Sequence, residues 1–373
     1  MKRLILIAVV TAMTAAGAVS AEGWQDRISL DGDFRHRFER TDDASKDTGR
    51  FRQRIRARLG LGAMVSDEWS AHLRLITGSS NPVSGNQTMG DGFSTKGFHL
   101  DRGYFKYSPS CIPGLSVMGG KFGNPFILMV KTGLIWDSDL SFEGASFKYM
   151  SGVSKRVDFH LRGGGFCVKE RKADDETRLF GGQTGLTVEA AEDVKVTFGG
   201  GFYSYDEVRG REGFYEAGEF SGNSTSHFFE VPGDSSTMYT GYANDFGLFE
   251  LFGELSFRIE KISCKIFGNF VQNGDTDENN QGWLAGTTIR KGRGAGSVKL
   301  RANYRRLEKD AVIGLFTDSD AFGGGTDGKG LHLGLGVGVA DNASLGFTYY
   351  LDRKDLEEEI DYTRYQLDVK VSF

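Results

Sequence analysis

The chain has 373 residues, a formal net charge of −5 and a mean hydropathy of −0.34. A net charge this small gives no reason to expect a nucleic-acid partner, and three cysteines, an odd number, cannot form a complete disulfide framework. Glycine is abundant, with 53 residues, but proline is rare, with 5, so the glycines do not belong to a disordered Pro/Gly-rich segment.

The N-terminus has the pattern of a secretory signal peptide. Lys2 and Arg3 precede the apolar segment Leu4–Ala18, and small residues follow at 19–21. We therefore predict a signal peptide over 1–21 and an exported mature domain over 22–373. No later segment offers about 18 consecutive apolar residues, so no transmembrane helix is predicted. A soluble periplasmic protein and an outer-membrane barrel both remain open at this point.

Apolar and polar residues alternate with a period of two along the whole mature chain, which indicates β-strands. The predicted strands are sixteen, at 26–40, 49–65, 68–78, 97–108, 114–122, 140–150, 154–169, 177–190, 193–205, 246–260, 262–273, 281–291, 295–308, 329–340, 342–352 and 361–373.

The connections between these strands alternate between short and long. The long, polar connections lie at 41–48, 79–96, 123–139, 170–176, 206–245, 274–280, 309–328 and 353–360. Short periplasmic turns and long outer loops are typical of a transmembrane barrel, whereas a soluble β-sandwich has no reason to alternate so regularly. The predicted fold class is therefore all-β, a transmembrane antiparallel β-barrel of 16 strands with both termini on the periplasmic side.

The last nine residues, 365–373, alternate strictly and end on Phe373. This resembles the closing strand of bacterial outer-membrane barrels, in which a terminal Phe is part of the signal read by the barrel assembly machinery. We expect this strand to pair antiparallel with the first strand, 26–40, and to turn its apolar face to lipid.

Three stretches resemble the bacterial putative-porin family of outer-membrane proteins. They are Lys121–Phe126 with Leu134–Leu140, Thr317–Asp320 with the Gly-rich 322–330, and Asn81–Ser84 with Asn86–Thr88. The resemblance covers most of the mature chain and implies an outer-membrane diffusion channel, without defining its solute. It also implies outer-membrane lipid, lipopolysaccharide and small hydrophilic solutes as partners, and a homotrimer as one expected assembly, because porins often form trimers.

One predicted strand carries five arginines at a period of two: Arg50, Arg52, Arg54, Arg56 and Arg58. On a lipid-facing surface each arginine near the midplane would cost about 2–4 kcal/mol, so this set must face the lumen. Neighbouring strands extend the set into a basic arc with Arg35, Arg37, His72, Arg74 and Lys370.

Because arginine stays charged and binds carboxylate or phosphate bidentately, the arc favours an anion-preferring channel. The alternative is that the arc pairs with acids inside the barrel, such as Asp31, Asp33, Glu39 and Asp101.

The third long connection, Gly123–Asp139, is predicted to fold inward and narrow the channel. Its middle, Phe126–Val130, is apolar and would pack inside the barrel rather than extend into water. Its polar residues of interest are Asn124, Lys131, Asp137 and Asp139. We expect the two aspartates to face the basic arc across the narrowest point. The alternative is an outer loop folded on its neighbours.

No cofactor or metal site is predicted. The segment from Asp275 resembles the start of a calcium loop, but Asn280 and Gly286 occupy the positions that require Gly and Glu. The chain is predicted not to be an enzyme. An outer-membrane barrel enzyme of the lipase or protease type would need a nucleophile beside a base. His72 with Ser70 and His160 with Asp158 are the pairs to consider, and lining of a polar lumen explains either pair better than catalysis does. A structural or adhesive barrel that binds a partner through 206–245 is the third alternative.

Overall fold

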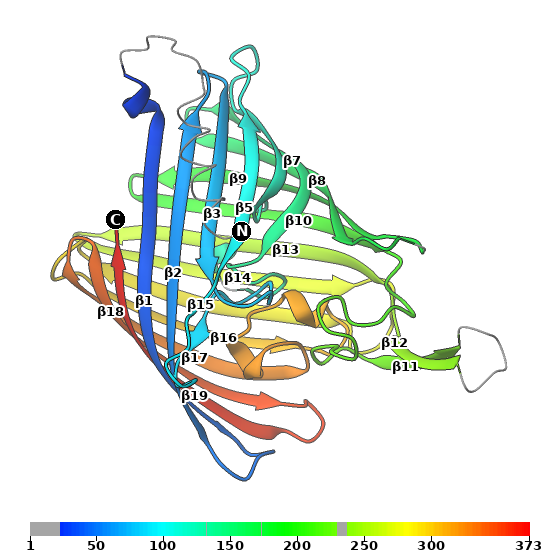
Figure 1. The fold of residues 1–373 in the computed structure, drawn as a ribbon. Helices are drawn as coiled ribbons and strands as arrows, with labels where there is room; N and C mark the ends of the chain where they lie inside the picture. Colours follow the sequence, from blue (N-terminus) through cyan, green and yellow to red (C-terminus); the bar gives the residue numbers. More distant parts are fainter. Residues whose placement is uncertain (1–22, 132, 173, 230–236) are drawn as a thin grey trace.

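The computed structural model, which describes residues 23–131, 133–172, 174–229 and 237–373, shows a closed antiparallel β-barrel (Figure 1). Its sheet has 17 strands, and because the two-residue β4 only pairs beside β2, sixteen strands form the wall. The wall strands are β1 (Ile28–Asp43), β2 (Arg50–Met64), β3 (Trp69–Thr77), β5 (Phe98–Tyr107), β6 (Leu115–Gly123), β7 (Ser141–Ser154), β8 (Val157–Lys169), β9 (Thr177–Ala191), β10 (Val194–Asp206), β13 (Phe246–Ile259), β14 (Ile262–Asn273), β15 (Gln281–Lys291), β16 (Val298–Leu307), β17 (Gly328–Ala340), β18 (Ala343–Lys354) and β19 (Ile360–Ser372). The predicted fold class and strand number are confirmed, whereas the predicted signal peptide, 1–21, lies outside the described residues.

The long connections contain short elements that the sequence pattern did not predict. They are β4 (Gln87–Thr88), the hairpin of β11 (Thr225–Phe229) and β12 (Met238–Tyr242), and the 3-10 helices η2 (Met129–Lys131), η4 (Gly314–Phe316) and η5 (Ala321–Gly323). A further 3-10 helix, η1 (Trp24–Arg27), precedes β1. These elements are too short to establish a period. The hairpin projects from the barrel, whereas η4 and η5 lie within the outline of the wall (Figure 1). None of the helices in the described residues is long and apolar enough to cross a membrane.

One predicted turn is wrong. The turn expected at 151–153 belongs to β7, which runs to Ser154, and β8 begins at Val157. The register between β7 and β8 shifts between Gly152 and Ser154, so an irregular residue interrupts the alternation there. A bulge of this kind hides the end of a strand from a period-two pattern.

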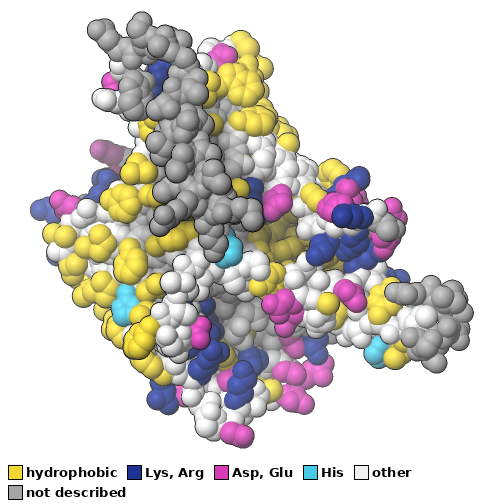
Figure 2. Space-filling model, viewed as in Figure 1, with side chains coloured by type: hydrophobic (Ala, Val, Ile, Leu, Met, Phe, Trp, Pro, Cys, Tyr) yellow, Lys and Arg dark blue, Asp and Glu magenta, His cyan; other side chains and the backbone are white. Residues whose placement is uncertain are grey.

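The alternation places apolar side chains on the outside of the wall and polar ones inside. On β19, Tyr365 and Leu367 are 38% and 47% exposed, whereas Gln366 between them is 1% exposed. Figure 2 shows hydrophobic side chains spread over the outside of the strands, with Lys, Arg, Asp and Glu gathered where the loops lie. An apolar exterior on a closed barrel suits a lipid environment, because each wall strand pairs with a neighbour on both sides and no strand edge is left open.

The first and last strands close the barrel. β1 and β19 pair antiparallel, with Arg35 opposite Lys370 and Phe38 opposite Leu367. At the end of the seam, Phe373 and Gly32 exchange two backbone hydrogen bonds of 3.0 Å. The predicted pairing of the terminal strand with the first strand is therefore confirmed.

Gly32→Ala should weaken this seam. A Cβ at this position would lie 2.5 Å from Cζ of Phe373 and 2.6 Å from the carbonyl oxygen of Arg58. The ring can turn away but the backbone cannot, so we expect a loss of about 1–3 kcal/mol in the free energy of unfolding in urea, measured on the barrel folded into lipid vesicles.

Gly182→Ala in β9 is the matched control, because nothing lies within 4 Å of its added Cβ. Equal stability of the two variants would contradict the role assigned to Gly32.

Candidate pore and its charged lining

The arginines of β1 and β2 face one another on the inner wall. The strand register places Arg35 opposite Arg56 and Arg37 opposite Arg54. Arg37 and Arg56 are both buried. Like charges directly opposite each other on one face of a sheet repel, so this arrangement requires acidic partners close by.

Acids on the wall itself supply part of that charge. Asp33 accepts hydrogen bonds from Arg56 at 3.1 Å and from Nε of Arg58 at 2.7 Å. Glu39 pairs with Arg52 and lies 3.8 Å from Arg54. On the next strands, Arg74 pairs with Asp101. Three of the four acids considered as internal partners therefore pair with the arc, and the fourth, Asp31, is exposed.

A second source of negative charge is the connection between β16 and β17, together with β19. Nε of Arg37 donates to Asp368 at 2.7 Å, and its Nη1 donates to Asp320 at 3.0 Å. Arg364 also donates to Asp320, at 2.8 Å. Burial alone would raise the pKa of the Asp320 carboxyl, but the guanidinium groups of Arg37 and Arg364 hold this pKa well below its ordinary value.

Sequence reasoning missed Asp320 and Arg364 as members of this cluster. Alternation along β19 could have placed Arg364 in the lumen, because the adjacent Tyr365 faces outward. Nothing in the local pattern shows that Asp320, a loop residue, reaches the wall.

The connection between β6 and β7, residues 124–140, lies inside the barrel. Phe126 stacks on Trp136 with ring centroids 5.2 Å apart and meets Tyr203 of β10 at 4.9 Å. Gln183 of β9 binds both backbone groups of Ile127, accepting from its N–H at 2.6 Å and donating to its carbonyl at 3.2 Å. Gln183 and Tyr203 are inward-facing wall residues, so the apolar part of this connection packs against the β9–β10 wall.

The far end of the same connection reaches the basic arc. Asp139 lies 3.1 Å from Arg56 and 3.5 Å from Arg58. β2 lies seven positions from β10 around a barrel of sixteen, so residues 124–140 join nearly opposite walls. Of the other candidate residues, Asn124 accepts the N–H of Phe126 at 2.8 Å, and the side chain of Lys131 lies outside the described part of the structure.

Asp137 binds another loop and not an arginine. Its carboxylate accepts the N–H of Ser319 at 3.1 Å and that of Asp139 at 2.7 Å, and its own N–H donates to Phe316 at 2.6 Å. Burial, with the negative charges of Asp318 and Asp139 nearby, raises the pKa of Asp137 well above its usual range. Asp137 therefore ties the two inward connections together.

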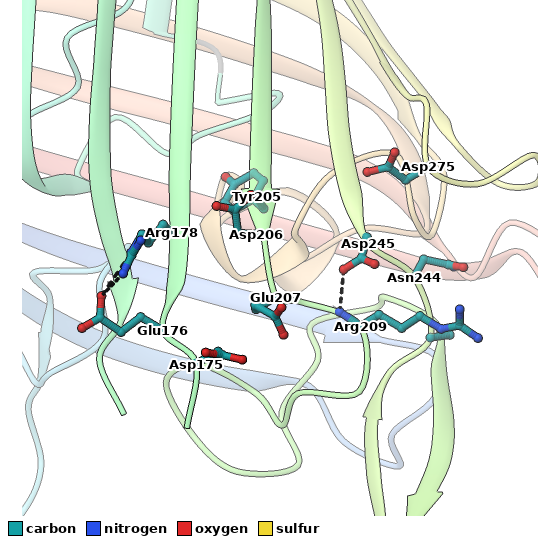
Figure 3. A pocket seen from close by; sticks show the side chains of 11 residues that line it. Asp175, Glu176, Arg178, Tyr205, Asp206, Glu207, Arg209, Asn244, Asp245 and Asp275 are labelled. Carbon is teal, nitrogen blue, oxygen red and sulfur yellow. Dashed lines mark hydrogen bonds and ion pairs between the residues drawn. The ribbon is translucent and has the colours of Figure 1, made fainter. Parts of the chain in front are cut away.

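An acidic cleft of about 740 Å³ lies at the outer rim, away from the arc (Figure 3). Its carboxylates are Asp175, Glu176, Asp206, Glu207, Asp245 and Asp275. Several already have partners: Glu176 pairs with Arg178 at 3.1 Å, and Asp245 accepts the backbone N–H of Arg209 at 2.8 Å. Across the residues described, no group of three or more His, Cys, Asp and Glu side chains is arranged to hold a metal ion.

The two histidine pairs considered for catalysis are placed differently. Oγ of Ser70 lies 3.0 Å from Nε2 of His72 on the inner face of β3. The His72 ring stacks on Tyr104 with centroids 4.8 Å apart. His160 contacts Thr187 at 3.0 Å and not Asp158. Both histidines thus take part in polar and aromatic packing of the lumen wall.

Comparison with known proteins gives a family and a fold. The family model described as putative porin matches residues 41–233 and 223–373. OprB of Pseudomonas putida, in its high-pH structure, matches with a TM-score of 0.60 at 12% identity, over 96% of this chain and 97% of that one. OmpF of Salmonella typhi, in complex with daunomycin, matches with a TM-score of 0.56 at 10% identity, over 93% of this chain and 97% of that one. No curated protein was found to match.

Asp137→Asn should change how stability depends on pH. The folded protein keeps a proton on Asp137 above the ordinary Asp pKa of about 3.9, whereas the unfolded chain releases it. The folded state therefore binds more protons in this window, so the Asp137 contribution to the free energy of unfolding falls as the pH rises from 3.9 to the raised pKa.

The measurement is urea unfolding of both proteins at a series of pH values from the ordinary Asp pKa of about 3.9 upward. In the variant, the free energy of unfolding should not show this part of the decrease with pH, whatever its value at any single pH. Parallel curves for the two proteins would contradict the assigned pKa direction.

Proposed function

Because the chain belongs to the putative porin family of the bacterial outer membrane, we propose that it forms a water-filled channel for the passive diffusion of small hydrophilic solutes, with a preference for anions. A barrel of about sixteen strands is wide enough to enclose an aqueous channel. Assembly as a homotrimer, surrounded by outer-membrane lipid and lipopolysaccharide, belongs to the same proposal and is supported by the apolar exterior.

The observation that carries the anion preference is a local surplus of positive charge. Within the described lumen wall, the cations of the arc on β1, β2 and β19 that are buried or half-buried are eight: Arg35, Arg37, Arg52, Arg54, Arg56, Arg58, Arg364 and Lys370. The carboxylates that pair with them are five: Asp33, Glu39, Asp139, Asp320 and Asp368. Eight minus five leaves three positive charges.

The surplus borders an open cavity. Arg50, Arg52, Arg54 and Arg364 line a space of about 820 Å³ together with residues of the long connections, among which Glu216 and Glu219 are the acids. Four cations against two carboxylates leave this lining cationic as well. Nε of Arg52, Arg54 and Arg364 is buried without a hydrogen-bond partner among the described residues. Guanidinium groups with spare donors favour carboxylate or phosphate solutes over cations.

The narrowing of the channel by residues 123–139 is supported by their position between opposite walls. Asp139 stands against the arc, and the aromatic packing around Phe126 fixes the other half. Acid and base facing each other at this point would create a transverse field that selects solutes by charge and size.

Reversal potentials in a KCl gradient across a planar bilayer test the anion preference. We expect chloride selectivity for the wild type and a chloride-to-potassium permeability ratio lower by about threefold in Arg52→Gln/Arg54→Gln, because each lost charge acts over several ångströms of water.

Arg40→Gln is the control for this experiment, since Arg40 is exposed outside the lumen and pairs with Asp42 at 2.9 Å. A wild-type channel selective for potassium would refute the anion preference.

Deletion of 126–133 tests the narrowing. Removing these eight residues should raise the single-channel conductance, because the segment fills space between the walls. The matched control is deletion of 89–96, an equally long and largely exposed segment. If both deletions leave the conductance unchanged, residues 123–139 do not limit the channel.

A further inference from the structure

A second basic cavity lies at the periplasmic end of the lumen, on the wall formed by β13 to β16. It has a volume of about 650 Å³. The inner faces of these strands and their short turns line it, and Val130 of the inward connection also borders it. The cavity is therefore below residues 124–140, whereas the basic arc of β1 and β2 opens above them.

The lining of this cavity, called here the inner basin, is strongly cationic. Its charged residues are Arg258, Lys261, Lys265, Arg290, Arg293 and Lys299, with Glu260 as the acid among them. Lys265 pairs with Glu254 at 2.6 Å, and Arg258 lies 3.6 Å from Asp193. Within the described residues, Lys261, Arg290 and Arg293 have no ion-pair partner.

A buried hydroxyl gives an independent indication of a ligand. Thr288 of β15 lines the inner basin and is 6% exposed. Its Oγ1 has no hydrogen-bond partner among the described residues. An unsatisfied buried hydroxyl costs free energy that a bound oxyanion or its water could recover.

We propose that the inner basin is a second anion-binding site, for small solutes with two or more negative charges on phosphate or carboxylate groups. Three unpaired cations on two turns and one strand can contact separate oxygens of one polyanion, and Arg290 and Arg293 can each bind an oxyanion bidentately. The site rests on the proposed channel, because it would hold a solute that has passed residues 124–140.

Block of single-channel current by pyrophosphate or citrate tests the proposal. Either anion, added to one side of the bilayer, should reduce the chloride current at a lower concentration than from the other side. In Lys261→Gln/Arg290→Gln/Arg293→Gln, the blocking concentration from the sensitive side should rise by about tenfold, because three unit charges are lost from the site.

Lys155→Gln/Arg156→Gln is the matched control. These residues are exposed in the turn between β7 and β8, at the same rim but outside the inner basin. This variant should keep the wild-type block. The unblocked conductance of each variant shows that its barrel has folded.

The outcomes separate the inner basin from the channel itself. Channels that conduct but are not blocked, or a triple variant blocked like the wild type, would overturn the inner basin and leave the channel in place. Absence of any conductance would refute the channel. Calorimetric titration of the detergent-folded protein with pyrophosphate would then test whether the inner basin binds anions. Equal binding by the wild type and the triple variant would overturn the proposed site.

Discussion

Repulsion between arginines on the first two strands is the constraint on which the interior depends. Arg35 faces Arg56 and Arg37 faces Arg54 across one strand pair, on a surface that cannot turn toward lipid. A buried charge that loses its partner costs about 3–5 kcal/mol, so the arrangement needs carboxylates brought to it. Asp33 and Glu39 come from β1, whereas Asp139 and Asp320 come from two long connections that must enter the barrel to reach the arc. The inward course of those connections follows from the charge on the wall.

The opposite wall holds the same connection by apolar packing. Phe126, Trp136 and Tyr203 form a buried aromatic group, and Gln183 fixes the backbone beside it. Gln183 also donates a hydrogen bond of 3.0 Å to Glu250, so its contact with residues 124–140 is part of a buried polar network. The lumen thus has a cationic side and an aromatic side, and residues 124–140 have an end suited to each. Such a division gives the connection one orientation, because exchanging its ends would bury Asp139 among aromatic rings.

The fold could be predicted from the sequence because alternation is local. Each strand needs only its own residues to show an apolar and a polar face, and the alternation failed where an irregular residue near Gly152 extended β7. The partners of the charges could not be predicted in this way. Asp320 meets Arg37 from 283 residues away, and only the closed barrel brings them together. The inner basin could not be predicted from the sequence for a related reason. Its residues Arg258, Lys265 and Arg290 lie on three different strands, and none of these strands carries a conspicuous run of charge.

The ion cluster at the seam has a consequence for biogenesis. Arg37 enters with the first strand, whereas Asp320, Arg364 and Asp368 belong to the last fifth of the chain. A nascent barrel that lacks β19 lacks Asp368, which binds Arg37, and Arg364, which binds Asp320. The lumen therefore acquires its final electrostatic balance in the same event that joins the two edges. Until then the arginines of β1 and β2 depend on Asp33, Glu39 and the acids of the inward connections alone, so closure of the barrel also completes the ion cluster at its seam.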